Sequence, residues 1–186
     1  QGMCIIRRLH KKFYYLLPVI ALMAFVVCMS GYMRQKESAP QKELKAKVRR
    51  IVYEVWNKGN TDVIDELYST EVVLQSTSSK YINGLEANIR RLENRRILYP
   101  DIEFTINEMI VKGNTVMLLW ACKGTQTGQL PTSSVKPTYK HFRLTGCCFF
   151  HFEEEKVVEE WEIYDRLTLM QQLGYKLVPP KQNDNN

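Results

Sequence analysis

The sequence predicts an α+β fold, with helices in the first part of the domain and an antiparallel sheet in the second. From Gln41, apolar residues recur at steps of three and four, which is the spacing of one helix face. From Ile102, apolar and polar residues alternate instead, as is typical of strands. The turn-forming stretches KGN (112–114) and EEEK (153–156) separate these strands, so we expect neighbouring strands to run antiparallel.

The first 33 residues differ in character from the rest of the chain. They contain four basic residues and no acidic ones, and the 21 residues 13–33 carry no charge. A basic flank followed by such an apolar run predicts a secretory signal or a membrane anchor, which would place the domain outside the cytoplasm. Cleavage near Ser30 and a lipid-modified Cys28 remain open alternatives.

The net charge of +6 comes mainly from this segment. The chain has 26 basic and 20 acidic residues, and four of the basic ones precede residue 34, which leaves 22 basic against 20 acidic residues. Because the remainder is nearly neutral, nucleic acid is a poor partner for it. We expect a polar linker at 34–40, one globular domain at 41–176 and a polar tail at 177–186.

Three helices are expected before the main strands. The first begins at Gln41 and ends at Gly59, and the second is a short helix capped by Thr61. A short strand follows at 71–76, and a third helix occupies 83–99 until Pro100 stops it. The apolar stripe of the first helix consists of Leu44, Val48, Ile51, Val52, Val55 and Trp56.

The sheet is expected to contain four longer strands. One begins at Ile102, and the next, at 116–126, is apolar on both faces, as in a strand covered on each side. The strand at 139–152 carries its apolar residues at even positions, and the last strand ends at Asp165. The cysteines of this region (Cys122, Cys147 and Cys148) lack the spacing of a zinc site, so we interpret them as small buried apolar residues, with a disulfide as an alternative.

Asp165 is the candidate catalytic residue. Strict alternation along the last strand places it on the same face as Val157, Trp161 and Ile163, which predicts an inward position. A carboxyl group in apolar surroundings has a raised pKa, which suits a general acid or base near neutral pH. The alternative is structural, because an aspartate between a strand and a helix often caps that helix.

Four segments together resemble the SnoaL-like polyketide cyclase family, which has the nuclear-transport-factor-like fold. They are VWNKGNTDVIDELYSTEVVLQ (55–75), YPDIEFTINEMIVKGNTVMLLW (99–120), KGTQTGQLP (123–131) and KVVEEWEIYDRLTLMQQLG (156–174). The resemblance covers about residues 41–176 and implies a cone-shaped α+β barrel with an apolar cavity. It also implies an acid/base role for Asp165 in an aldol-type ring closure that needs no cofactor and no metal.

The chain departs from the family pattern at three positions. Family members commonly carry histidine at the positions of Gln75 and Gln126, and arginine at the position of Leu119. Glutamine can donate a hydrogen bond to a carbonyl oxygen, but it cannot accept and return a proton at neutral pH. The expected site therefore has one titratable group, with Gln75 and Gln126 orienting the substrate.

The resemblance also suggests which other residues line the cavity. Trp56, Trp120 and Trp161 are bulky enough to bind a flat apolar ligand, with an ordinary core role as the alternative. If Gln126 faces inward, Trp120 and Cys122 do so as well. Antiparallel pairing across 127–138 then places Cys122 opposite Cys147 or Cys148, of which Cys148 is the better partner.

Two functions are consistent with these observations. The first is an enzyme that acts on a small apolar carbonyl-bearing molecule by cyclisation or isomerisation. The second is a non-catalytic module that binds a small molecule, or forms a homodimer, at the membrane surface. The absence of a glycine-rich phosphate loop and of a nucleophile-elbow motif argues against phosphoryl transfer and serine hydrolase chemistry.

Overall fold

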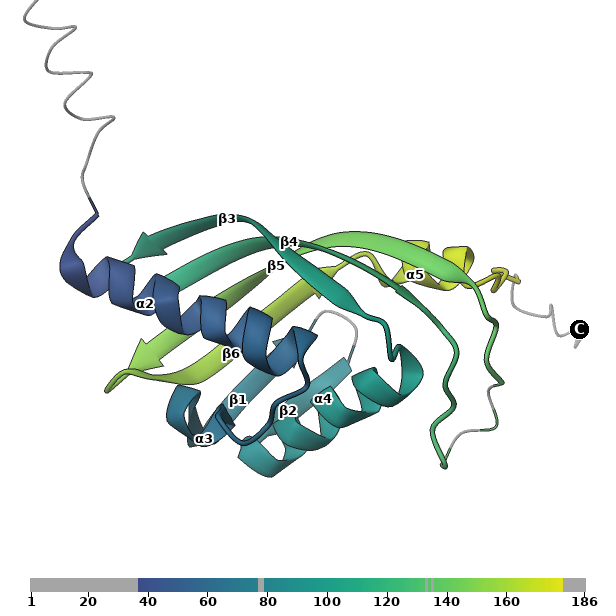
Figure 1. Ribbon diagram of the computed structural model, residues 1–186, viewed down its shortest axis with the longest axis horizontal. Coiled ribbons are helices and arrows are strands. Elements are labelled where there is room, and N and C mark those ends of the chain that lie inside the picture. Colours follow the sequence, from purple (N-terminus) through teal and green to yellow (C-terminus); the bar gives the residue numbers. More distant parts are fainter. Residues whose placement is uncertain (1–36, 77–78, 133, 135, 179–186) are drawn as a thin grey trace, which may run out of the picture. The chain divides into compact units, whose positions relative to one another are not determined.

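The computed structural model describes residues 37–76, 79–132, 134 and 136–178, and the chain divides into two units, residues 1–38 and 39–186. The second unit contains the predicted domain (Figure 1). The expected signal or anchor at 13–33, residues 34–36 of the expected linker and residues 179–186 of the expected tail lie outside the described residues. Within the described ranges, no helix is both long enough and apolar enough to cross a bilayer.

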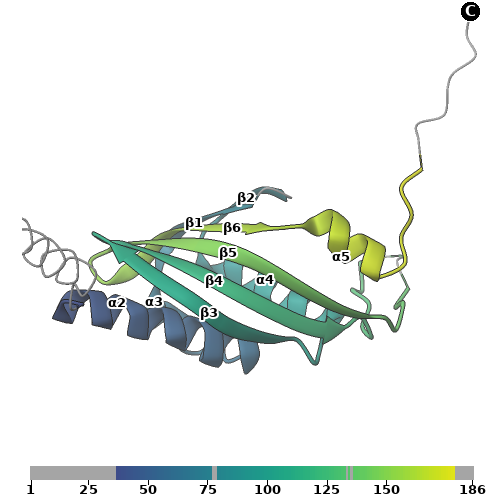
Figure 2. The same cartoon turned by 90° about the horizontal axis from the view of Figure 1, so that it is seen from above.

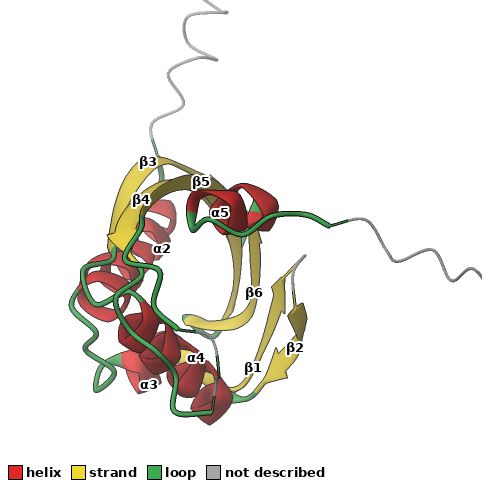
Figure 3. Ribbon diagram, turned by 90° about the vertical axis from the view of Figure 1, so that its right-hand side faces the viewer, coloured by secondary structure: helices red, strands yellow, loops and turns green. Residues whose placement is uncertain are grey.

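Six strands form one curved, open sheet in the order β2-β1-β6-β5-β4-β3. All neighbouring pairs are antiparallel except β1 and β6, which run parallel. Figure 3 shows the sheet curling around helices α2 and α4, which lie on its concave side. The predicted α+β architecture is therefore confirmed. The strands are β1 (Tyr68–Ser76), β2 (Ser79–Asn83), β3 (Glu103–Lys112), β4 (Thr115–Thr125), β5 (His141–Glu153) and β6 (Lys156–Tyr164).

The helices bury the apolar stripe that the sequence predicted. Helix α2 (Ala39–Arg50) continues directly into a π-helical segment, η1 (Ile51–Asn57), and α3 (Ile64–Leu67) follows. Helix α4 (Leu85–Leu98) lies between β2 and β3 in the sequence, and α5 (Arg166–Gln172) ends the domain (Figure 2). The residues of α2 and η1 that are at most 3% exposed are Val48, Ile51, Val52, Val55 and Trp56.

A β-bulge in β6 decides which side chains face the concave side. Val157 pairs with Phe152 and Glu159 pairs with His151, so Val158 is an extra residue without a partner on β5. After this residue the alternation is reversed relative to Val157: Glu160 and Glu162 are buried, whereas Trp161 and Ile163 are more than a third exposed. The predicted inward face of the last strand is therefore wrong, because strict alternation from Val157 does not hold across a bulge.

The register of β4 and β5 separates the cysteines that the sequence had placed opposite each other. Thr125 pairs with His141, so Cys122 lies opposite Leu144, and Cys148 lies opposite Leu118. All three cysteines of this region are free thiols. The expected position of Cys122 opposite Cys147 or Cys148 is wrong, and the interpretation of Cys122 and Cys148 as small buried apolar residues is confirmed.

Candidate functional site

A cavity of about 590 Å³ lies between α4, β1 and β6 on the concave side of the sheet. Its walls combine charged side chains, Arg91 and Arg95 from α4 and Glu160 and Glu162 from β6, with apolar ones such as Leu74, Ile82 and Leu169. An adjoining part of about 60 Å³ has aromatic and aliphatic walls, including Trp120. The side chains that line both parts are Arg95, Tyr99, Glu162, Tyr164 and Leu169. We name the two parts together the inner cavity. Apolar side chains therefore line both parts, as expected, and in the larger part they surround a cluster of charged groups.

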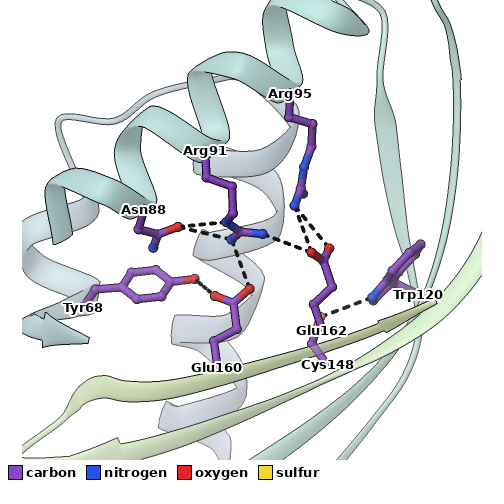
Figure 4. A network of polar contacts seen from close by, with 8 residues as sticks. All are labelled: Tyr68, Asn88, Arg91, Arg95, Trp120, Cys148, Glu160 and Glu162. Atoms are coloured by element: carbon purple, nitrogen blue, oxygen red, sulfur yellow. Dashed lines mark hydrogen bonds and ion pairs between the residues drawn. The ribbon is translucent and has the colours of Figure 1, made fainter. Parts of the chain in front are cut away.

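Glu160 is almost fully buried, and both of its oxygens accept hydrogen bonds (Figure 4). Tyr68 Oη donates to Oε2 at 2.7 Å, and Arg91 Nη2 donates to Oε1 at 3.2 Å. Burial and the negative charge of Glu160 raise the pKa of Tyr68 well above its usual value, so this phenol stays protonated. Burial alone would lower the pKa of Arg91, but the charges of Glu160 and Glu162 raise it. This half of the network is a fully paired buried ion pair.

Glu162 is held between two guanidinium groups. Arg91 Nη1 donates to its Oε2 at 3.0 Å, and Arg95 Nη2 donates to Oε1 at 3.2 Å and to Oε2 at 3.3 Å. Burial alone would raise the pKa of Glu162, but the positive charges of Arg95 and Arg91 and their hydrogen bonds outweigh burial and lower it. Glu162 is therefore an ionised carboxylate that lines both parts of the inner cavity.

The two arginines and the two glutamates meet because of matching periods on two elements. Asn88, Arg91 and Arg95 are three and four residues apart, so they project from one side of α4 toward β6 (Figure 4). Glu160 and Glu162 are two residues apart and therefore share one face of the strand. Asn88 Oδ1 fixes the Arg91 guanidinium by accepting from Nε at 3.3 Å and from Nη2 at 3.1 Å.

This network is not apparent from the sequence. The strict alternation expected along the last strand would put Glu160, Glu162 and Tyr164 on the outer face, and the helix pattern gives no reason to select Arg91 or Arg95. The available signal was the charge complementarity of two basic residues spaced four apart on a helix and two acidic residues spaced two apart on a strand. Without the position of the bulge, that pattern is equally consistent with a solvated surface.

The small part of the inner cavity is lined by aromatic rings and by the thiol of Cys122, and the buried Cys148 lies behind Trp120. The Trp120 ring lies 5.3 Å from the Phe104 ring and 6.3 Å from the Tyr164 ring, between centroids. Trp120 Nε1 donates to Cys148 Sγ at 3.3 Å. Burial raises the pKa of Cys122 to about 12 and raises that of Cys148 well above its usual value. Both thiols are therefore protonated at neutral pH and are poor nucleophiles.

Asp165 lies on the outer side of the sheet, where it caps helix α5. Its Oδ1 accepts from Thr168 N at 2.9 Å, and its Oδ2 accepts from Thr168 Oγ1 at 2.6 Å. These bonds to the Thr168 hydroxyl and amide lower the pKa of Asp165, and the side chain is exposed. The expected inward position with a raised pKa is wrong, and the capping alternative describes the geometry.

The two glutamines occupy different surroundings. Gln75 lines the inner cavity and donates through Nε2 to Glu159 Oε1. Gln126 is buried, as expected, but its Oε1 accepts from Thr138 Oγ1 at 2.8 Å, and its backbone pairs with Tyr139 and Lys140. Gln126 thus fastens the segment that connects β4 to β5, and it does not line the inner cavity.

The three tryptophans are also dispersed. Trp120 lines the small part of the inner cavity, as the sequence suggested. Trp161 is 38% exposed on the outer face, where its Nε1 donates to Glu159 Oε1 at 2.9 Å. Trp56 packs in the core against Phe104, with ring centroids 5.0 Å apart, and lines a separate pocket.

A metal site requires several His, Cys, Asp or Glu side chains that lie close together. Among residues 37–76, 79–132, 134 and 136–178, no group of three or more His, Cys, Asp or Glu side chains is placed to hold a metal ion. The expectation that the protein needs no metal or cofactor remains a prediction.

Solved structures share this fold. A candidate SnoaL-like polyketide cyclase from Jannaschia sp. CCS1 is 22% identical with a TM-score of 0.69, over 78% of this chain and 99% of that one. A candidate polyketide cyclase from Acidithiobacillus ferrooxidans is 24% identical with a TM-score of 0.61, over 70% and 94%. An LEH-like epoxide hydrolase from Mycobacterium tuberculosis is 12% identical with a TM-score of 0.57, over 74% and 89%. At these identities the likeness shows the fold alone, and the fold carries more than one chemistry.

Sequence comparison is more specific than the structural likeness. No curated protein sequence matches the chain. The sequence model of one family matches residues 46–173, which include η1, α4 and all six strands. The match covers most of the chain and the whole of the inner cavity. The chain therefore belongs to the SnoaL-like polyketide cyclase family.

Proposed function

We propose that this protein binds a small carbonyl compound in the inner cavity and catalyses its cyclisation or isomerisation, with Glu162 as the base. The observation that carries the proposal is the position of Glu162. Its carboxylate is ionised, and it lines both the charged and the aromatic part of the inner cavity. A substrate that spans the two parts would bring its reacting carbon next to this group.

The proposed reaction begins with the transfer of a proton from a carbon of the substrate to Glu162. Glu162 removes a proton from the carbon beside a carbonyl group, and the electron pair of that C–H bond becomes an enolate. The enolate carbon then attacks a second carbonyl of the same molecule, or it is reprotonated at another position. Glu162 returns the proton to the new alkoxide or carbon, so no oxidant or reductant is consumed.

The enolate oxygen needs a hydrogen-bond donor, and two phenols are in place. Tyr99 and Tyr164 both line the two parts of the inner cavity. Burial is the main cause that raises the pKa of Tyr99, and the neighbouring Tyr164 is the second. The Tyr99 hydroxyl therefore stays protonated at neutral pH and can donate a hydrogen bond. We assign the oxyanion-stabilising role to these two phenols.

The lowered pKa of Glu162 restricts the substrate class. A carboxylate paired with two guanidinium groups is always ionised at neutral pH, but it is a weak base. It therefore suits carbons whose protons are acidified by two neighbouring carbonyl groups. The charged groups in the larger part of the inner cavity also suit polar substituents on the small, largely apolar carbonyl compound that the sequence suggested.

A non-catalytic binding function is the second candidate, and one observation favours it. Both oxygens of Glu160 and both oxygens of Glu162 already accept hydrogen bonds from the protein. A network that is closed on itself can hold the cavity open for a ligand without reacting. Location at the membrane surface through residues 13–33 remains part of this proposal.

Deuterium exchange separates catalysis from binding without knowledge of the natural substrate. The probe is ethyl 2-methylacetoacetate, which has a single proton between two carbonyl groups, and its exchange in D₂O is followed by NMR at a pH where the uncatalysed rate is slow. We expect the protein to accelerate exchange and Glu162→Gln to reduce the acceleration about 100-fold.

Two matched substitutions serve as controls. Glu108→Gln makes the same change at an exposed position of β3, away from the inner cavity, and Asp165→Asn removes the charge of the α5 cap. Both should keep the rate within about twofold. Loss of exchange in Asp165→Asn with a normal rate in Glu162→Gln would transfer the catalytic role to Asp165. Saturable binding of the probe with no acceleration would leave the binding function.

A further inference from the structure

Glu160 is a second carboxylate beside the proposed base, and the proposed reaction does not involve it. Its side chain is almost completely buried, with 1% exposure. Burial of a carboxylate costs free energy even when it is ion-paired, and an apolar side chain of similar size is often as stabilising at such a position or more so. The placement of Glu160 next to Glu162 therefore indicates a role in the site rather than in the stability of the fold.

One guanidinium group serves both carboxylates. Arg91 Nη2 donates to Glu160 Oε1 at 3.2 Å, and Arg91 Nη1 donates to Glu162 Oε2 at 3.0 Å (Figure 4). Because the guanidinium group carries a single positive charge, the negative charge of Glu160 offsets part of the attraction that Arg91 exerts on Glu162. Without the Glu160 charge, Glu162 would bind a proton less tightly and would be a weaker base.

The position of Arg91 does not depend on Glu160 alone. Asn88 is fully buried three residues earlier on α4, and its Oδ1 accepts from Arg91 Nε at 3.3 Å and from Nη2 at 3.1 Å. Glu162 accepts from the remaining nitrogen, Nη1. Removal of the Glu160 charge should therefore leave Arg91 in place and strengthen its attraction to Glu162.

The other charged side chains of the inner cavity are arginines. Arg95 Nη2 donates to both Glu162 oxygens, at 3.2 Å and 3.3 Å. Arg90 and Arg166 also line the larger part of the inner cavity, but both are exposed, so water and salt screen their charges. Among the described residues that line the inner cavity, Glu160 is the one carboxylate besides Glu162.

Thiols and phenols complete the surroundings of Glu162, and they are neutral at pH 7. Cys148 lies directly opposite Glu162 on β5, and burial raises the pKa of its thiol well above the usual value. Burial also raises the pKa of Cys122, which lines the small part of the inner cavity, to about 12. The phenols of Tyr99 and Tyr164 line both parts, and a phenol is protonated at this pH. The balance of charge at Glu162 is therefore set by the network in Figure 4.

We propose that Glu160 is a positioning residue for the reaction described above: it shares Arg91 with Glu162 and thereby keeps the Glu162 carboxylate basic enough to remove a proton from carbon. Tyr68 supports this role, because its phenol donates at 2.7 Å to the Glu160 oxygen that Arg91 does not bind. The role of Glu160 rests on the proposed function of Glu162 as the base, and it makes the strength of that base depend on a neighbouring carboxylate.

Titration of Glu162 in the full chain tests this role without turnover. Glu160→Gln keeps the size of the side chain and a hydrogen-bond acceptor but removes the charge. The carboxyl signals of ¹³C-labelled glutamate are followed by NMR against pH, and the Glu162 signal is the one that disappears in Glu162→Gln. We expect the pKa of Glu162 to be about 1 pH unit lower in Glu160→Gln than in the wild type. The exchange rate of ethyl 2-methylacetoacetate at pH 7 should fall about threefold with it.

Two further substitutions separate the effect of the Glu160 charge from a loss of structure. Glu160→Met replaces the charged group by an apolar one of similar size, so it should lower the pKa of Glu162 in the same direction. Asp165→Asn is the matched control, because it removes a carboxylate three residues from Glu162 that is bonded to Thr168 rather than to either arginine. It should leave the pKa of Glu162 unchanged.

The direction of the shift decides the outcome. An unchanged or higher pKa of Glu162 in Glu160→Gln overturns the proposal, and a higher value would mean that Glu160 merely holds Arg91 against Glu162. A lower pKa in a protein that catalyses no exchange would refute the proposed reaction alone, while the dependence of Glu162 on Glu160 stands. Exchange by the wild type, with the same pKa of Glu162 in both proteins, would retain the reaction and overturn the role of Glu160.

Discussion

Glu162 is a buried carboxylate between two arginines, and its ionisation contributes to the stability of the fold. Its pKa in the folded protein lies below 4.5, its usual value, because the charges of Arg95 and Arg91 outweigh burial. A group with a lowered pKa in the folded state stabilises the protein fully above its unfolded pKa, and this contribution is lost as the pH falls through the folded pKa. The free energy of unfolding should therefore decline in acid partly through this one residue.

Replacement of Glu162 by Gln tests that linkage. At pH 7 the change leaves two partly buried guanidinium groups without their partner, and we expect it to lower the free energy of unfolding by about 3 kcal/mol. The difference between the two proteins should shrink as the pH falls below about 4.5, because wild-type Glu162 then becomes neutral as well. Urea unfolding at several pH values measures it. Glu86→Gln, on the exposed side of α4, should show no such trend, and a difference that is independent of pH would contradict the assignment.

At the scale of secondary structure, strand β6 shows what the sequence could and could not predict. The even positions of β5 were predicted correctly because this strand alternates without interruption, and most of the stripe of the first helix is buried although the backbone changes from α-helical to π-helical at Ile51. The face of Asp165 was predicted wrongly, because one extra residue, Val158, reverses the alternation after Val157. A bulge is fixed by pairing with the neighbouring strand, and that pairing is not visible in the β6 sequence.

Helix α4 was difficult to predict for a different reason. Leu92 is buried, as is usual for an apolar residue on an amphipathic helix, but the long side chains of Arg91 and Arg95 are also only 17% and 15% exposed. Sequence patterns assign arginine to the solvent side of a helix, and only the presence of Glu160 and Glu162 on the facing strand compensates the burial of its charge. The candidate site thus depends on a tertiary match between two elements distant in the sequence.

Gly146 in β5 is a further point at which two elements fix the site. A Cβ atom added there would lie 2.4 Å from Trp120 Cζ2 and 2.6 Å from Ile163 O, closer than real contacts allow. Gly146→Ala should therefore displace Trp120 or β6 and lower the free energy of unfolding by about 1–3 kcal/mol. Gly124→Ala is the matched control in β4, because its closest contact is the Phe142 ring tip at 3.0 Å, which can move. Denaturant midpoints compare the two variants, and equal midpoints would show that Trp120 is free to shift.

At the scale of the whole molecule, the convex face of the sheet carries an exposed apolar surface that we expect to bind a partner. The register places Leu119, Cys147 and Ile163 in one row across three strands, and Met117, Phe149 and Trp161 in the next. Leu119, Trp161 and Ile163 are each 37–39% exposed. An exposed apolar patch that extends across neighbouring strands commonly marks an interface. We propose that a second copy of the chain covers it, in line with the homodimer that the sequence suggested.

A charge placed in the centre of this face tests the homodimer. Ile163→Glu adds a carboxylate to the row of Leu119 and Cys147, and its burial between two copies would be unfavourable without a partner charge. We expect sedimentation to give twice the chain mass of 21.8 kDa for the wild type and a single chain for Ile163→Glu. Tyr53→Glu makes a comparable change at a 46% exposed position of η1, away from the sheet, and should stay dimeric. A wild type that sediments as one chain, or an Ile163→Glu variant that remains dimeric, would remove the convex face as the interface. The inner cavity is on the opposite, concave side, so Ile163→Glu should retain the deuterium exchange of the wild type even as a single chain.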